Sequence, residues 1–287
     1  MRLYNLIIDF FAPKKTFYIQ DQKSFDSIIE DIESQKILGL DTEFIWRNTY
    51  YPKLSLIQVS TLNKIYIIDC ITINISEIGK ILENKNIIKI FHAIRGDSSV
   101  LYNCLGIKTN NIFDTQLAEE VLTKNEGIQI SYKKLVKKYC LKNISKSETN
   151  SDWDKRPLRE KQLAYAAEDV RYLHTIMKIQ YNKLKRSKSL EKFNIKCDHE
   201  KNLGEENFSK SRLKRFRKKN KNITKVDIEI FSWREDQAKK LNVPPSHIFE
   251  DRDLKKIKKN LDKKKFEEFR WIIKKDTSRN DFIKYFL

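Results

Sequence analysis

The sequence predicts an α/β domain with a mixed sheet flanked by helices, followed by a small all-α domain. Most short runs rich in Ile, Leu and Val lie before residue 92, whereas helical apolar spacing prevails after it. Strands that come first and then alternate with helices are typical of a mixed sheet with helices on its faces. The chain has 287 residues, of which 40% are apolar, so it can bury one full core and a smaller second one.

The expected elements follow one another in a definite order. A strand at 16–19 and a helix at 24–34 come first, and strands at 37–44, 54–60 and 64–69 then form a meander with short polar connections. The later elements are a helix beginning at 78, a strand at 87–91, and helices at 95–105, 115–122 and 132–139. Gly106 ends the helix at 95–105.

A long helix over 158–184 is expected to close this domain. Its apolar stripe consists of Leu163, Ala166, Val170, Leu173 and Met177. Pro157 suits the first turn of this helix, and Asp154 is a candidate cap. The polar segment 142–157 before the helix predicts a loop.

Composition changes after this helix and predicts three parts: a domain at 1–184, a basic linker at 185–222, and a helical domain at 223–287. Residues 1–180 hold 26 Lys and Arg against 22 Asp and Glu, whereas residues 181–287 hold 32 against 17. Most of the net charge of +19 therefore lies in the C-terminal third. Within it, a dense basic run suits contact with polyphosphate, although a solvated linker is the ordinary alternative. The run consists of Arg212, Lys214, Arg215, Arg217, Lys218 and Lys219.

Four carboxylates and a tyrosine lie at or near the ends of buried elements. Asp41 and Glu43 are two positions apart in a strand, so their side chains point to the same face. Tyr165 and Asp169 are four apart in a helix and share a face as well, and Asp97 begins the helix that follows the strand at 87–91. Taken singly, each has an ordinary explanation as a strand-end pair, a boundary pair or a helix cap. Taken together, they suit two divalent cations acting on a phosphodiester.

The motifs around these residues resemble ribonuclease D, a family of 3′→5′ exoribonucleases in the tyrosine-bearing branch of the DEDD superfamily. The first motif is Leu-Asp-Thr-Glu-Phe at 40–44, followed by Thr-Tyr-Tyr-Pro-Lys-Leu-Ser-Leu-Ile-Gln at 49–58. The second is Phe-His-Ala-Ile-Arg-Gly-Asp at 91–97, with Phe-Asp-Thr-Gln at 113–116, and the third includes Ser-Asp-Trp at 151–153 and Tyr-Ala-Ala-Glu-Asp-Val at 165–170. The resemblance covers roughly residues 16–180, and all five catalytic positions of the family are filled. The chain departs from the family at Ser98, where Leu is usual after the aspartate.

The resemblance implies a ribonuclease-H-like fold and metal-dependent release of nucleoside 5′-monophosphates from RNA 3′ ends. Its catalytic residues are Asp41, Glu43, Asp97, Tyr165 and Asp169, of which the four carboxylates hold two divalent ions, Mg²⁺ or Mn²⁺. Tyr165 orients the attacking water, because a phenol with an ordinary pKa of about 10 stays protonated at neutral pH. The family suggests tRNA precursors and other small structured RNAs as substrates.

A second resemblance lies at 233–254, which is similar to the helical HRDC module of certain helicases and of ribonuclease D. The chain has room for one copy, and residues 266–287 match the module poorly.

Two other functions share parts of this pattern. Proofreading and helicase-linked DNA exonucleases use the same carboxylate set, and a non-catalytic RNA-binding protein could keep the fold. A zinc site is not expected, because the four cysteines are scattered and form no Cys-x-x-Cys pair. The ligand-type run Cys197-Asp198-His199-Glu200 also lacks a second cluster that could complete a site. We expect a cytoplasmic monomer, since no apolar run is long enough for a membrane helix and residues 1–10 lack the features of a secretory signal.

Overall fold

The computed structural model describes residues 14–145, 147–220 and 222–287, which form two compact units. The first unit includes 14–45 and 53–205, and the second includes 46–52 and 206–287. The expectation about a secretory signal at residues 1–10 lies outside the described residues. None of the helices in the described ranges is long and apolar enough to cross a membrane.

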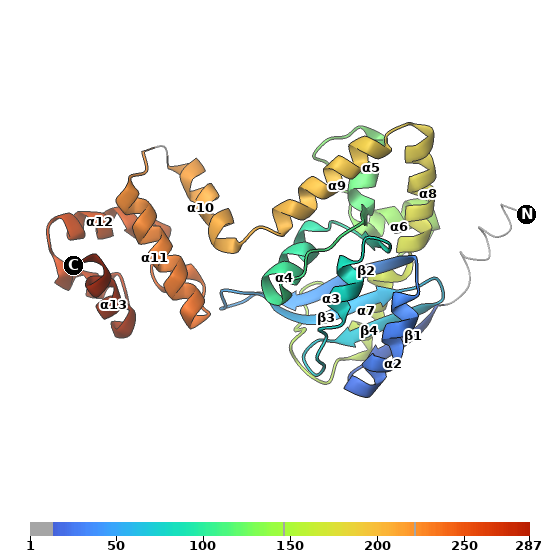
Figure 1. The fold of residues 1–287 in the computed structure, drawn as a ribbon, viewed down its shortest axis with the longest axis horizontal. Helices are drawn as coiled ribbons and strands as arrows, with labels where there is room; N and C mark the ends of the chain where they lie inside the picture. Colours follow the sequence, from blue (N-terminus) through green and yellow to red (C-terminus); the bar gives the residue numbers. More distant parts are fainter. Residues whose placement is uncertain (1–13, 146, 221) are drawn as a thin grey trace, which may run out of the picture. The chain divides into compact units, whose positions relative to one another are not determined.

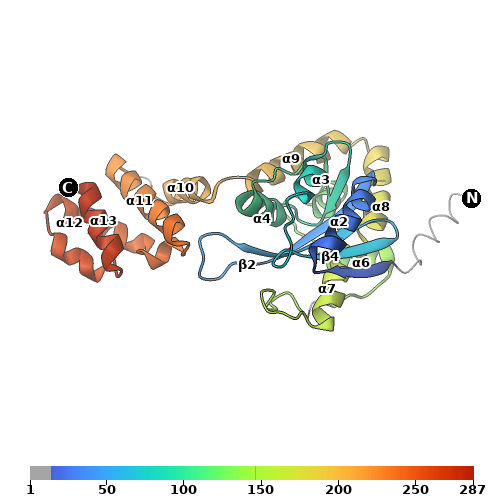
Figure 2. The ribbon, with the colours of Figure 1, turned by 60° about the horizontal axis from the view of Figure 1, so that its bottom comes forward.

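The first unit is a mixed six-stranded sheet with helices on both of its sides (Figures 1 and 2). Its strands are β1 (Lys15–Ile19), β2 (Ile37–Ile45), β3 (Lys53–Ser60), β4 (Lys64–Asp69), β5 (Ile88–Phe91) and β6 (Ile112–Asp114). Its helices are α2 (Gln22–Glu33), α3 (Ile78–Glu83), α4 (Arg95–Leu105), α5 (Thr115–Thr123), α6 (Tyr132–Cys140), α7 (Glu160–Arg171), α8 (Leu173–Arg186) and α9 (Leu190–Gly204).

The sheet has the order β1-β4-β3-β2-β5-β6, and β2, β3 and β4 form the expected antiparallel meander. The remaining neighbours are parallel. Apolar side chains pack on both faces: one core cluster joins the sheet to α2, α3 and α4, and the other joins it to α5 through α9. The predicted fold class is therefore confirmed. Strand β6 was not among the expected strands, because three residues carry too little periodicity.

The long helix expected at 158–184 is two helices, α7 and α8, that meet at Tyr172. The backbone N–H of Tyr172 donates to the hydroxyl of Tyr132 at 3.1 Å, and this competes with a helical bond at that position. Helix α7 also begins later than predicted, at Glu160, and Arg159 caps it. Asp154 does not cap it, since its carboxylate pairs with Lys53 at 2.5 Å.

The segment expected to be a linker at 185–222 contains two helices instead, α9 and α10 (Phe208–Lys219). Helix α9 belongs to the first unit, where Phe193 and Cys197 are 1% and 2% exposed. At its end the backbone of Gly204 lies so close to α4 that an added Cβ would meet the Arg95 carbonyl oxygen at 2.6 Å.

The second unit is helical apart from the segment Trp46–Pro52, which connects β2 to β3. Besides α10 it contains α11 (Lys225–Leu241), η1 (Pro245–His247), η2 (Asp251–Asp253), α12 (Leu254–Asp262), η3 (Phe266–Trp271) and α13 (Asp276–Phe286). Tyr50 is fully buried in this unit: its hydroxyl donates to Glu235 at 2.8 Å, and the Arg212 guanidinium lies 4.6 Å from the centre of its ring. The all-helical expectation for 223–287 is confirmed.

Candidate active site

The first two carboxylates of the candidate site come from the central strand β2. Asp41 pairs with Gln58 and Glu43 with Leu56 across the antiparallel ladder, so both side chains project to one face. The parallel ladder between β2 and β5 ends at Gly39. Asp41 and Glu43 therefore lie in the part of β2 that extends beyond its pairing with β5. Within the described residues, no neighbouring strand pairs with β2 on that side at these two positions.

Helix α7 brings a carboxylate from a distant part of the chain, that of Asp169, close to Asp41 and Glu43. One carboxylate oxygen from each of Asp41, Glu43 and Asp169 lies within 4.8 Å of the other two. All three side chains are partly exposed. Three acidic groups this close repel one another unless a proton or a cation intervenes.

The pKa values of the site show this repulsion. Burial, together with the charges of Asp97, Asp169 and Glu43, raises the pKa of Asp41 well above its usual value. Burial and the neighbouring carboxylates raise the pKa of Glu43 to about 9. Hard divalent cations prefer such oxygen donors, so the donor set fits Mg²⁺ or a similar ion.

Asp97 lies in the first turn of α4 and is 7% exposed. Its carboxylate accepts a 2.6 Å hydrogen bond from the hydroxyl of Thr42, the residue between Asp41 and Glu43. Burial raises the pKa of Asp97 to about 7, although the bond from Thr42 opposes this. Asp97 is outside the group of three carboxylates but close enough to raise the pKa of Asp41.

Tyr165 lies one turn before Asp169 on α7, and its hydroxyl is 3.2 Å from the hydroxyl of Thr149. Its ring centre is 6.0 Å from that of Trp153. Burial and the charge of Asp169 raise the pKa of Tyr165, whereas the contact with Thr149 lowers it less. Tyr165 therefore stays protonated at neutral pH, and its hydroxyl can orient a nucleophile without being deprotonated.

The segment 142–157, which contains Thr149, forms no helix or strand among its described residues, as the sequence predicts. The guanidinium of Arg156 fixes this segment by donating to both oxygens of the buried Asp69, at 2.5 and 2.7 Å. Sequence reasoning missed Thr149 and Asp69. Thr42 could have been noticed, because it stands inside the Asp-Thr-Glu motif.

The basic run at 212–219 lies on α10, and its six members differ in their surroundings. Arg212 is engaged inside the helical unit, where it pairs with Glu235 at 3.0 Å and stacks on Tyr50. Lys214 pairs with Glu206. Lys214 is nevertheless exposed, as are Arg215, Arg217, Lys218 and Lys219, and these last four form no ion pair within the described residues.

Known proteins are similar to this chain in sequence and in fold. A family model described as 3′-5′ exonuclease matches residues 16–185. Ribonuclease D of Desulfotalea psychrophila is 34% identical over 85% of this chain and 67% of its own length. The chain belongs to the ribonuclease D family of 3′-5′ exonucleases. It spans between 56% and 67% of the length of the first three curated ribonuclease D relatives.

Solved structures agree with the ribonuclease D fold. Escherichia coli RNase D, an exoribonuclease involved in structured RNA processing, superimposes with a TM-score of 0.73 at 24% identity, covering 82% of this chain and 63% of that one. Brucella melitensis NrnC with bound Mg²⁺ has a TM-score of 0.56 at 22% identity, covering 67% of this chain and 92% of that one. At these identities the two structures establish the fold alone.

Proposed function

We propose that this ribonuclease D family member is a metal-dependent 3′→5′ exoribonuclease that releases nucleoside 5′-monophosphates. The observation that carries the proposal is the convergence of Asp41, Glu43 and Asp169 within 4.8 Å, with Tyr165 one helical turn away from Asp169. Family membership supports RNA as the substrate. The involvement of E. coli RNase D in structured RNA processing supports small structured RNAs as substrates, and the family resemblance adds tRNA precursors.

In this proposal Asp41, Glu43 and Asp169 hold one divalent ion, and Asp41 with Asp97 holds a second. Bound ions stabilise the negative charge that develops on the phosphodiester oxygens. The Tyr165 hydroxyl orients the attacking water, and Thr149 fixes the direction of that hydroxyl. The bond from Thr42 keeps the buried Asp97 carboxylate turned toward β2. The Mg²⁺ bound in the NrnC structure supports Mg²⁺ as an ion for this site, with Mn²⁺ as the alternative.

The helical unit at 206–287 is, in the same proposal, an HRDC-like module that binds RNA outside the active site. The members of the basic run that are exposed and not paired with an acid, Arg215, Arg217, Lys218 and Lys219, contact phosphates. Arg212 contributes to the stability of the unit and not to phosphate contact, because it is engaged by Glu235 and Tyr50.

The test is digestion of an end-labelled RNA with a 3′ overhang, and of the matched DNA, in Mg²⁺, in Mn²⁺ or in EDTA. We expect stepwise shortening of the RNA from its 3′ end, nucleoside 5′-monophosphate products, no reaction in EDTA, and loss of most of the activity in Asp41→Asn. Hydrolysis that persists in EDTA would refute the metal site. Faster digestion of the DNA would identify a DNA exonuclease, and binding without hydrolysis would identify an RNA-binding protein.

A further inference from the structure

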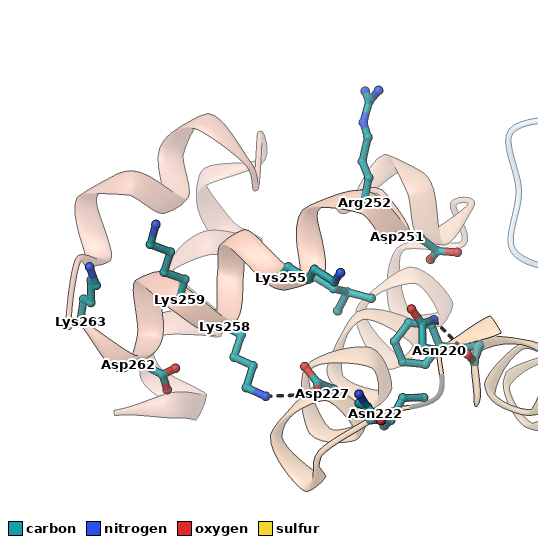
Figure 3. Close-up of a pocket in the computed structure, with 13 residues that line it drawn as sticks. Asn220, Asn222, Asp227, Asp251, Arg252, Lys255, Lys258, Lys259, Asp262 and Lys263 are labelled. Carbon is teal, nitrogen blue, oxygen red and sulfur yellow. Dashed lines mark hydrogen bonds and ion pairs between the residues drawn. The ribbon is translucent and has the colours of Figure 1, made fainter. Parts of the chain in front are cut away.

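Two adjoining hollows lie in the helical unit, the first beside α10 and α12 and the second beside α10 and α11. The first has a volume of about 640 Å³ and the second about 500 Å³, and both are bordered by Phe216, Asp251 and Arg252. Figure 3 shows the first hollow, with most of its labelled side chains ending in a charged group. The shared border makes the two hollows one continuous surface across these helices.

Three lysines of the first hollow carry charge that no neighbour neutralises. Lys258 is paired, since its ammonium lies 3.2 Å from the carboxylate of Asp227 (Figure 3). The ammonium groups of Lys255, Lys259 and Lys263 are exposed and form no ion pair within the described ranges. Of the acidic residues that line this hollow, Asp227 is paired with Lys258, and Asp251 is paired with the buried Arg234 at 2.7 Å. Only Asp262 is left to offset the charge of the three lysines within the described ranges.

The second hollow adds two cations from α10. Arg215 and Lys219 are four positions apart, so they share a face of the helix, and both are exposed. Neither has an ion-pair partner in the part of the chain that the structure describes. The other basic side chains of this hollow are engaged: Arg212 by Glu235, Arg234 by Asp251, and Arg252 by Glu250 at 2.9 Å.

We propose that these two hollows form one binding surface for the phosphodiester backbone of RNA. Its five contact residues, which define the α10–α12 surface, are Arg215, Lys219, Lys255, Lys259 and Lys263. The inference deepens the proposed function, on which it rests, and moves the centre of RNA contact from the basic run of α10 to a surface that α12 shares. Three of the five residues lie outside that run.

The chemistry of the surface favours a polymer of phosphates. Cations spread over two helices and two hollows match charges that repeat along a strand, whereas a single small anion would use one or two of them. Lysine ammonium groups act as point charges and bind phosphate without selecting a base. The one aromatic ring at the shared border, Phe216, is 9% exposed and offers no face on which a base could stack. Binding here should therefore depend strongly on salt and weakly on sequence.

The experiment compares two triple variants of the full chain with equal loss of charge. The test variant carries Lys255→Gln, Lys259→Gln and Lys263→Gln. The control carries Lys240→Gln, Lys256→Gln and Lys265→Gln, three exposed lysines of the same unit that border neither hollow. Affinity for a labelled single-stranded RNA is measured in EDTA over a range of salt concentrations, and circular dichroism confirms that both variants fold.

Each phosphate contact on a single strand adds about 0.7 to the slope of log affinity against log salt, so losing three contacts lowers that slope by about 2. We expect this loss in the test variant and a much smaller one in the control, which also keeps the parent cleavage rate at saturating RNA and Mg²⁺. Equal slopes in the two triple variants would overturn the inference. A parent protein that binds RNA with this difference but hydrolyses nothing would instead refute the proposed function and leave the α10–α12 surface intact.

Discussion

Replacing Phe193 with alanine should destabilise the nuclease unit strongly, because α9 is part of its core. The side chain is 1% exposed, and its ring centre lies 4.7 Å from that of Phe113 on β6. Removing a buried phenylalanine costs about 3–5 kcal/mol, through lost transfer free energy and the cavity left behind. For a unit of this size each kcal/mol lowers the melting temperature by about 2–4 °C, so the expected decrease is about 6–20 °C.

The matched control is Ile195→Ala on the same helix, since Ile195 is 65% exposed and its loss should change the free energy of unfolding by less than about 0.5 kcal/mol. Melting is followed by circular dichroism, and the nuclease unit is followed separately by residual activity after brief heating. If Phe193→Ala lowers the melting temperature no more than Ile195→Ala does, then α9 contributes nothing to the core and the linker predicted from the sequence is the better description.

Three further predictions concern the candidate site and the loop beside it. Asp41→Asn should abolish most hydrolysis while raising the melting temperature measured in EDTA, because one of the mutually repelling carboxylates is gone; a near-normal rate in Mg²⁺ would contradict the metal assignment. Tyr165→Phe should slow single-turnover cleavage by about 10²–10⁴-fold with little change in RNA affinity, and an equal loss in both would make it a substrate contact. Burial raises the pKa of Asp69, but hydrogen bonds from Arg156 and Tyr18 more than offset this and hold it below its usual value. The stability that Asp69 contributes is therefore present above pH about 4 and is lost as the pH falls through the lowered pKa. In urea melts, the free energy of unfolding of Asp69→Asn should approach that of the parent only under acidic conditions.

The sheet was predictable because its signals are local. The strands from Ile37 to Asp69 are long apolar runs with short polar connections, and the meander follows from them. Tyr172 shows where local signals fail: the apolar stripe continues through it, and the break depends on a hydrogen bond to Tyr132, forty positions away. The prediction of a linker at 185–222 was wrong at α9 for a related reason. It buries a narrow stripe at Phe193 and Cys197, and its remaining residues are as polar as those of a linker.

The site was predictable as a set of residue types but not as a geometry. Alternation in β2 and helical spacing in α7 placed Asp41 with Glu43 and Tyr165 with Asp169. That Asp169 comes within 4.8 Å of Asp41 and Glu43 follows from the packing of α7 against β2, which no local pattern encodes. The partners of Tyr165 and Asp97 are hydroxyl groups from Thr149 and Thr42. Thr42 stands inside the Asp-Thr-Glu motif, whereas Thr149 lies in a polar loop where nothing in the sequence distinguishes it.

A run of basic residues in a sequence overstates the charge available to a nucleic acid. In α10 the side chain of Arg212 is 19% exposed, and its guanidinium pairs with the fully buried Glu235, which also accepts a hydrogen bond from Tyr50. A buried carboxylate needs a compensating cation, so Arg212 cannot turn to a phosphate without leaving an uncompensated charge, at a cost of several kcal/mol. Lys255 and Lys259, by contrast, lie outside the run and keep their charge exposed at a hollow. The cations that we propose contact RNA are those without an internal acid, and their positions follow from the packing of the helices, not from the density of lysine and arginine along the chain.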